Sequence, residues 1–411
     1  MEKENIVLVN AHWSNHGDEA AIFAIVGEIL KHKPDATLSL IIKDKKEVVP
    51  ELMIHNHKVS CVSNQFLPKV FDYYVQLYSN GKHGKNMAMK RYIEILKGAD
   101  YIFYAPGGSV INDRFWWRKQ LEYMLPLWYA KRYKKPIYVA SPSIGPFEAK
   151  HKIRNFIRRR IFSGTKFLYV REEMSYEYLK KIGAEKTAKV TIDSAFCSEV
   201  HIKEQEKVYE ADEGLTAFMK HYQRVVGVTI TELDWNVKFL GQNMGEKIVG
   251  EMRDFLSFLC REGIGVVLIP QLFGNQNDKS LLEKYSNNME NTFILNPEYS
   301  ADFQQYLISK LYMVIGMRYH SNIFSAKMGV PFLPVMYEEK MESFVKEAGL
   351  ERYAVYVEDI NADALCKKFL KIEDEYEEYK SKLSELKAYW EKRAEVTKES
   401  MKGFLTNNRE Q

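Results

Sequence analysis

The chain is poor in cysteine and lacks both a long apolar run and a cluster of metal-binding side chains. Its 411 residues include 4 cysteines. These lie far apart without a Cys-x-x-Cys pair, which argues against a disulfide framework and a cysteine zinc site. His12 and His16 have no third ligand spaced near them, so we expect no metal site there.

No stretch approaches the roughly 18 consecutive apolar residues of a membrane-spanning helix. The chain enters a strand-like pattern at once, with no basic leader and no apolar segment behind it. We therefore expect no signal peptide. Together with the sparse cysteines, this pattern predicts a cytoplasmic location.

The composition is that of a soluble globular protein, and the length predicts two domains. Hydrophobic residues make up 46% and charged residues 28% of the chain, which excludes a disordered protein. The formal net charge of +4 is unevenly distributed, because residues 84–166 contain 18 Lys+Arg against 5 Asp+Glu. This local excess defines a basic region inside the N-terminal half.

Short β-rich runs alternate with helical patterns along most of the chain. Such alternation predicts two doubly wound, Rossmann-like α/β domains with parallel sheets. We expect an N-terminal domain over 1–205, a polar linker near 198–223, a C-terminal domain over 220–365 and an amphipathic helix over 366–405. Expected strands are 6–10, 37–42, 58–62, 101–105, 136–140, 167–170, 225–230, 265–269, 292–295, 313–315 and 332–335, with helices at 18–31, 116–133, 150–162 and 246–261. The final helix could form a coiled coil, but we expect it to pack back on its own chain.

The turn after the first strand carries Asn15, Gly17 and Asp18. Ligands of open α/β sheets bind outside the carboxyl ends of the strands, so turns at these ends are candidate sites. Gly17 permits close backbone approach, and the start of the helix offers free N–H groups. Asp18 could have a catalytic role or could only cap this helix.

Two further turns follow strands and carry candidate acceptor-binding residues. Gly107 and Gly108 belong to a Pro-Gly-Gly-Ser turn, where backbone N–H groups can face a ligand. Ser143 lies in a Ser-Pro-Ser-Ile-Gly-Pro turn. Both segments could also be ordinary turns without a binding role.

Three cationic side chains follow strands in both predicted domains. Arg171 ends a strand and could hold a carboxylate or phosphate, or could pair with Glu172 or Glu173. Arg318 precedes His320 at a strand-to-helix turn, where an imidazole beside a cation suits acid–base chemistry on an anion. Lys340 follows the next strand and could reach the same place.

The ordered set of motifs resembles the polysaccharide pyruvyl transferase family over residues 5–350. The motifs that carry the resemblance are N-x-x-G-D-E-A, P-G-G-S, S-I-G-P, V-R-E-E-x-S, T-I-D-S-A-F (191–196), I-P-Q (269–271), G-M-R-Y-H-S-N-I-F-S-A-K-x-G-V-P (316–331) and M-Y-E-E-K (336–340). The Arg-x-His block with its trailing Gly-Val-Pro and Tyr-x-x-Lys is the most specific part.

The resemblance implies a GT-B-like fold and transfer of the enolpyruvyl unit of phosphoenolpyruvate to two sugar hydroxyls, as a pyruvate ketal with release of phosphate. It implies catalytic roles for His320, Asp18 and Arg171, and donor binding by Arg171, Arg318, His320 and Lys340. On the acceptor side we place Asn15, Gly17, Asp18, Gly107, Gly108 and Ser143. Phosphoenolpyruvate is the donor substrate, and no other cofactor and no metal is expected.

This chain departs from the family pattern at three places. It has Pro106-Gly107-Gly108-Ser109 where the family often has three glycines, and Ser141-Pro142-Ser143 where the family often has Gly-Gln-Gly. Asp193 precedes Ser194 rather than Pro. These changes line the presumed acceptor side, so the acceptor is less defined than the donor.

The basic region over 114–160 interleaves Lys and Arg with Trp, Tyr and Phe. This pattern suits an anionic membrane surface and a lipid-linked carbohydrate acceptor, but the aromatics could equally be core residues beneath a solvated cationic face. No base-reading motif accompanies the region, so we expect no nucleic-acid partner. Two other functions stay open, a nucleotide-sugar glycosyltransferase of the same architecture and a non-catalytic assembly protein.

Overall fold

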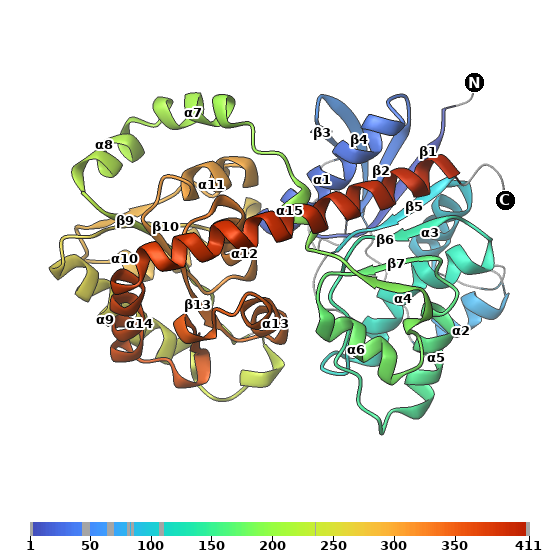
Figure 1. Ribbon diagram of the computed structural model, residues 1–411. Coiled ribbons are helices and arrows are strands. Elements are labelled where there is room, and N and C mark those ends of the chain that lie inside the picture. Colours follow the sequence, from blue (N-terminus) through green and yellow to red (C-terminus); the bar gives the residue numbers. More distant parts are fainter. Residues whose placement is uncertain are drawn as a thin grey trace. The chain divides into compact units, whose positions relative to one another are not determined.

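The alternating strands and helices form two parallel-sheet units (Figure 1). The computed structural model describes residues 3–42, 50–63, 70–79, 83, 86–106, 111–234 and 236–407. Unit 1 comprises Met1–Trp13, Ala21–Ser198 and Arg393–Gln411, and unit 2 comprises Ser14–Ala20 and Glu199–Lys392.

Unit 1 is built on an eight-stranded sheet in the order β3-β4-β2-β1-β5-β6-β7-β8. The strands pair in parallel except for the antiparallel β3–β4 pair at one edge. The strands are β1 (Asn5–Ala11), β2 (Thr37–Ile42), β3 (Glu51–Ile54), β4 (His57–Ser63), β5 (Tyr101–Tyr104), β6 (Ile137–Val139), β7 (Phe167–Val170) and β8 (Ala188–Val190).

Helices cover both faces of this sheet. They are α1 (His16–His32), whose first residues belong to unit 2, α2 (Val70–Ser79), α3 (Met87–Gly98), α4 (Trp117–Arg132), α5 (Lys152–Phe162) and α6 (Glu173–Lys181). Successive side chains of a strand point to opposite faces. Accordingly, Val7 joins the core with α3, α4 and α5, while Leu8 joins the core with α1 and Phe404.

Unit 2 has a six-stranded parallel sheet in the order β11-β10-β9-β12-β13-β14. Its strands are β9 (Val225–Thr229), β10 (Gly265–Leu268), β11 (Thr292–Ile294), β12 (Met313–Gly316), β13 (Phe332–Met336) and β14 (Val355–Tyr356). Its helices are α7 (Ile202–Ala211), α8 (Glu213–His221), α9 (Met244–Arg261), α10 (Lys279–Ser286), α11 (Ala301–Ile308), α12 (Tyr319–Met328), α13 (Glu339–Glu347), α14 (Ala362–Asp374) and most of α15 (Tyr376–Asn407).

The predicted fold class is confirmed, with two local differences. The predicted linker is helical, because α7 and α8 occupy it (Figure 1). The single predicted tail helix is two helices, α14 and α15, separated at Glu375. The Glu375 carboxylate accepts a hydrogen bond of 2.8 Å from Tyr353, and Tyr376 stacks on Tyr312 with ring centroids 4.4 Å apart. These contacts fix the chain where the two helices meet.

Helix α15 packs on its own chain, as the sequence predicts. In unit 2, the buried Tyr379 donates a hydrogen bond of 2.8 Å to the carbonyl of Phe332. In unit 1, Phe404 is fully buried and makes edge-to-face contacts with Tyr101 and Phe103. The apolar stripe of α15 is therefore buried against other parts of the same chain.

No helix in the described part of the chain combines the length and the apolar character needed to cross a bilayer.

Candidate active site

The core of the candidate site is the turn from β12 into α12. Strand β12 ends at Gly316, Arg318 occupies the N-cap position, and His320 is the second residue of α12. Asn322 ties the turn together, since its Nδ2 donates to the carbonyls of Gly316 at 3.0 Å and Arg318 at 3.2 Å. A Cβ at residue 316 would lie 2.0 Å from Asn322 Oδ1, so this turn requires glycine.

The amino end of α12 presents positive electrostatic potential. Its N-cap residue makes no side-chain capping hydrogen bond, so the first turn keeps the partial positive charge of a helix N-terminus. The guanidinium of Arg318 adds a full positive charge at the same place. This arrangement suits an anionic ligand.

Asp278 holds Arg318 in position. Arg318 Nη2 donates to Asp278 Oδ1 at 2.8 Å, and Nε donates to the carbonyl of Ile230 at 3.3 Å. The other carboxylate oxygen of Asp278 accepts the backbone N–H groups of Gln271 and Leu272 at 2.8 and 3.0 Å. The guanidinium is thus oriented by a carboxylate that is itself fixed by the backbone.

Lys340 lies close to the same turn. Its Nζ is 5.4 Å from the ring centroid of Tyr319, the first residue of α12, and 2.7 Å from Glu338 Oε2. Tyr337, just before this pair, is buried. Burial, followed by the charge of Glu338, raises the pKa of Tyr337 well above its ordinary value, so the phenol stays neutral.

Residues Ser14–Ala20 belong to unit 2, although the sequence placed them in the N-terminal domain. The backbone N–H of His16 donates to Gln271 at 3.0 Å. The His16 ring Nδ1 lies 2.8 Å from Glu19 Oε2, and its Nε2 lies 3.0 Å from the carbonyl of Pro297. Glu19 also accepts the N–H of Ala301 at the start of α11. These contacts attach the first turn of α1 to unit 2.

This attachment brings Gly17 against His320. A Cβ built on Gly17 would lie 1.9 Å from both Cγ and Nδ1 of the His320 ring. The glycine backbone therefore lies directly on the imidazole, with no room for a side chain. Two motifs about 300 residues apart in the sequence meet here.

Asn15, rather than Asp18, caps α1. Asn15 Oδ1 accepts the N–H of Gly17 at 2.9 Å and of Asp18 at 3.4 Å. The alternative that Asp18 serves as the N-cap is wrong, because Asp18 lies inside the first turn of the helix. The cap comes from Asn15 because its amide oxygen precedes the helix and reaches these N–H groups.

Arg171 and Ser143 lie in unit 1 and are buried. Arg171 Nη1 is 2.5 Å from Asp193 Oδ2, and Nε donates to Ser143 at 2.7 Å and lies 3.2 Å from Glu172 Oε2. The predicted alternative, an ion pair with Glu172, is therefore present. Burial raises the pKa of Glu172, although Arg171 opposes that shift.

The remaining predicted residues, Gly107 and Gly108, lie outside the described residues. The structure adds Asp278, Glu19 and His16 to the candidate site. Asp278 follows the Ile-Pro-Gln motif by seven residues, which is the one sequence signal that could have indicated it. Among the described residues, no group of three or more His, Cys, Asp or Glu is arranged to hold a metal ion.

The architecture is that of GT-B-like enzymes. HepE of Anabaena, solved with UDP and glucose, matches with a TM-score of 0.60 at 12% identity, over 99% of this chain and 100% of that one. The UDP-GlcNAc 2-epimerase of Neisseria meningitidis matches with a TM-score of 0.55 at 11% identity, over 97% of this chain and 99% of that one. At such low identity these matches define the fold alone.

The family is defined by sequence. The sequence model of the polysaccharide pyruvyl transferases matches residues 15–339, and the chain belongs to this family. The amylovoran biosynthesis protein AmsJ of Erwinia amylovora is 24% identical over 412 aligned residues, covering 92% of this chain and 94% of that protein. The predicted resemblance is confirmed, and the family makes the protein a transferase of polysaccharide biosynthesis.

Proposed function

We propose that the protein transfers the enolpyruvyl unit of phosphoenolpyruvate to a sugar of a surface polysaccharide or exopolysaccharide, or of its lipid-linked precursor, as a pyruvate ketal. The observation that carries the proposal is the meeting of Gly17 and His320 beside Arg318. It gathers an acid–base group, a cation and two helix N-termini. The reaction proceeds in the cytoplasm, with phosphoenolpyruvate as donor and without a further cofactor.

The donor binds at the amino end of α12. Phosphoenolpyruvate carries a carboxylate and a phosphate, which suit the helix N-terminus and the planar guanidinium of Arg318. Within the described part of the chain, Nη1 of Arg318 donates to no other residue, while Nε and Nη2 are occupied. Lys340 adds a second positive charge near Tyr319.

His320 gives and receives protons in this scheme. It protonates C3 of the donor, and a sugar hydroxyl then attacks C2 and loses its proton to the imidazole. The C2–O bond to phosphate breaks with phosphate as the leaving group, and the second hydroxyl closes the ketal on C2. One hydroxyl proton replaces the proton delivered to C3, and the other leaves with phosphate. Asp18 orients the acceptor or accepts a hydroxyl proton.

For Arg171 and Ser143 we propose a structural role in addition to the binding roles that the family implies. The family implies donor binding by Arg171 and acceptor contact by Ser143. Their mutual hydrogen bond and the ion pairs of Arg171 with Asp193 and Glu172 support a further task, holding three turns of unit 1 together.

The test is phosphoenolpyruvate-dependent phosphate release across a panel of sugar acceptors, with the ketal identified by NMR. We expect His320→Ala to lose at least about 100-fold in rate, the usual scale of general acid–base catalysis. His221→Ala is the matched control, because His221 is an exposed histidine of the same unit. A folded His320→Ala variant that forms ketal at the wild-type rate would refute the role of His320.

A nucleotide-sugar glycosyltransferase is the second candidate function, since the fold neighbour HepE was solved with UDP and glucose. A comparison of thermal stabilisation by phosphoenolpyruvate and by UDP separates the two. Stabilisation by phosphoenolpyruvate alone supports pyruvyl transfer, whereas stabilisation by UDP alone favours the glycosyltransferase. Binding of neither favours a non-catalytic assembly protein.

A further inference from the structure

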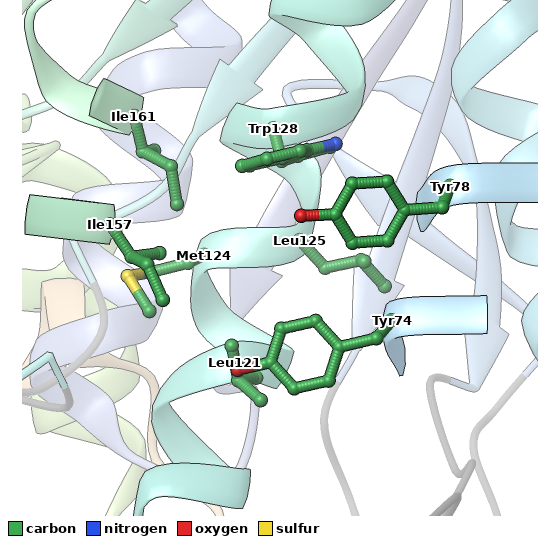
Figure 2. A pocket seen from close by; sticks show the side chains of 8 residues that line it. All are labelled: Tyr74, Tyr78, Leu121, Met124, Leu125, Trp128, Ile157 and Ile161. Carbon is green, nitrogen blue, oxygen red and sulfur yellow. The ribbon is translucent and has the colours of Figure 1, made fainter. Parts of the chain in front are cut away.

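An apolar pocket opens in unit 1 among α2, α4 and α5 (Figure 2). The pocket is partly open to solvent. Ile157 and Ile161 of α5 lie opposite Tyr74 and Tyr78 of α2, with side chains of α4 between them. The lining residues from α4 are Leu121, Met124, Leu125 and Trp128. Such a lining suits a hydrocarbon chain.

The apolar lining continues out onto the surface. Ile153, Ile157 and Ile161 follow i, i+4 spacing and form one stripe along α5. The two inner residues line the pocket, while Ile153 is 78% exposed. Phe156 on α5 is also exposed, as is Trp116 directly before α4, and both helices line the pocket. Large exposed apolar side chains on the helices of an apolar pocket are typical of an interaction surface.

The same surface is cationic. Helix α5 has no acidic residue, and its Arg159 and Arg160 guanidinium carbons lie 5.6 and 5.9 Å from the ring centroid of Phe156. Among the described residues, neither arginine pairs with a carboxylate, and neither does Lys152. An exposed aromatic ring between two unpaired arginines fits a partner with negative charge outside and hydrocarbon inside.

We propose that this surface, which we call the α5 face, binds an anionic phospholipid bilayer. Phe156, Ile153 and Trp116 enter the headgroup region, and Arg159 and Arg160 contact lipid phosphates. One acyl chain occupies the pocket. Nucleic acid would match the charge, but it offers no hydrocarbon for the aliphatic pocket. The proposal does not depend on the chemistry at His320.

Sedimentation with vesicles tests the α5 face in the full-length protein. We expect binding to phosphatidylcholine vesicles that contain phosphatidylglycerol, little binding to phosphatidylcholine alone, and loss of binding at high salt. The double variant Arg159→Glu/Arg160→Glu should bind at least about 30-fold more weakly, because each of the two lost basic residues near an anionic surface contributes roughly a factor of five. Lys380→Glu/Lys392→Glu makes the same charge change on exposed lysines of α15 and should bind normally.

A second pair of variants tests the contribution of the exposed apolar side chains to vesicle binding. Phe156→Asp should weaken vesicle binding about tenfold. Leu370→Asp on α14 should not, although Leu370 is 45% exposed and Phe156 is 50% exposed. Equal binding of all variants, or binding to an RNA oligomer but not to vesicles, would overturn the proposal.

Tryptophan fluorescence tests occupancy of the pocket. Vesicles with brominated acyl chains should quench Trp128, which lines the pocket. Trp128→Phe should therefore lower the amount of fluorescence that the vesicles quench, and Trp13→Phe should leave that amount unchanged, because Trp13 stacks on Phe23 away from the pocket lining. Quenching that survives Trp128→Phe in full would show that no acyl chain enters the pocket.

Discussion

Replacing Gly17 with alanine tests the meeting of the two distant motifs. The added Cβ would lie 1.9 Å from Cγ and Nδ1 of His320, whereas ordinary contact begins near 3.4 Å. The imidazole or the start of α1 must then move by about 1.5 Å. A displacement of about 1 Å in a catalytic group can cost about 100-fold in rate. We therefore expect the catalytic rate constant to fall by that factor, which corresponds to about 2.7 kcal/mol.

Protein stability should fall as well. Overpacking costs about 1–3 kcal/mol, and denaturant unfolding measures it. The sign of the stability change is informative, because alanine is a better helix former than glycine by roughly 1 kcal/mol, so without a clash Gly17→Ala should stabilise the protein. Gly250→Ala is the control, since Gly250 lies inside α9 with nothing within 4 Å of the added Cβ. It should raise the free energy of unfolding.

A double variant completes the test. Removing the ring by His320→Ala should relieve the strain of Gly17→Ala, so the stability losses of the two changes should not add. A Gly17→Ala protein that is more stable and fully active would refute the close contact. Strict additivity would show that residues 17 and 320 do not touch.

Three further predictions concern other parts of the chain. Asp278→Asn should weaken phosphoenolpyruvate binding about tenfold by calorimetry, because it removes the charge that orients Arg318; unchanged affinity would contradict this. Burial raises the pKa of Asp113, but hydrogen bonds from Arg158 and a backbone N–H bring it below its ordinary value. The ionised Asp113 therefore contributes its full stabilisation above about pH 4, and this contribution is lost as the pH falls further. Asp113→Asn should make the free energy of unfolding depend less steeply on pH in the acid range, and an unchanged dependence would refute this prediction. Phe404→Ala should cost about 3–5 kcal/mol in urea unfolding, since its ring is fully buried, and a loss below about 1 kcal/mol would show that α15 adds little to unit 1.

Much of the fold could be predicted because the central strands are buried on both faces. Strand β5, for example, is Tyr-Ile-Phe-Tyr with every residue buried, and such runs are recognisable without knowledge of their neighbours. The short edge strands β3, β8 and β14 were missed. Their residues are mostly half-buried or exposed, so the apolar signal is weak.

Polarity alone could not distinguish a linker from surface helices. Helix α7 has no buried residue, and its sequence therefore reads as a solvated connection. The break at Glu375 was also hidden, because the apolar spacing continues across it. It depends on Tyr353 and Tyr312, which are distant in the sequence.

The sequence predicted individual residues of the candidate site but not the contacts between them. Arg318 and His320 share one turn, and local spacing is enough to find them. The contact of Gly17 with His320 and the pairing of Arg318 with Asp278 depend on tertiary packing. A single sequence without related sequences contains no signal that either pair is in contact.

The three consecutive arginines of α5 show why a charge count is a weak guide to function. Each residue of a helix is rotated by about 100° from the one before. Arg158 consequently points inward, where it is fully buried and pairs with Asp113 at 2.7 Å. Arg159 and Arg160 point outward beside the exposed Phe156. The first arginine stabilises unit 1, and only the other two are available to an anionic partner. The strong local charge thus combines a structural ion pair with the surface that we propose binds lipid, and substitutions at the three positions should separate the two roles.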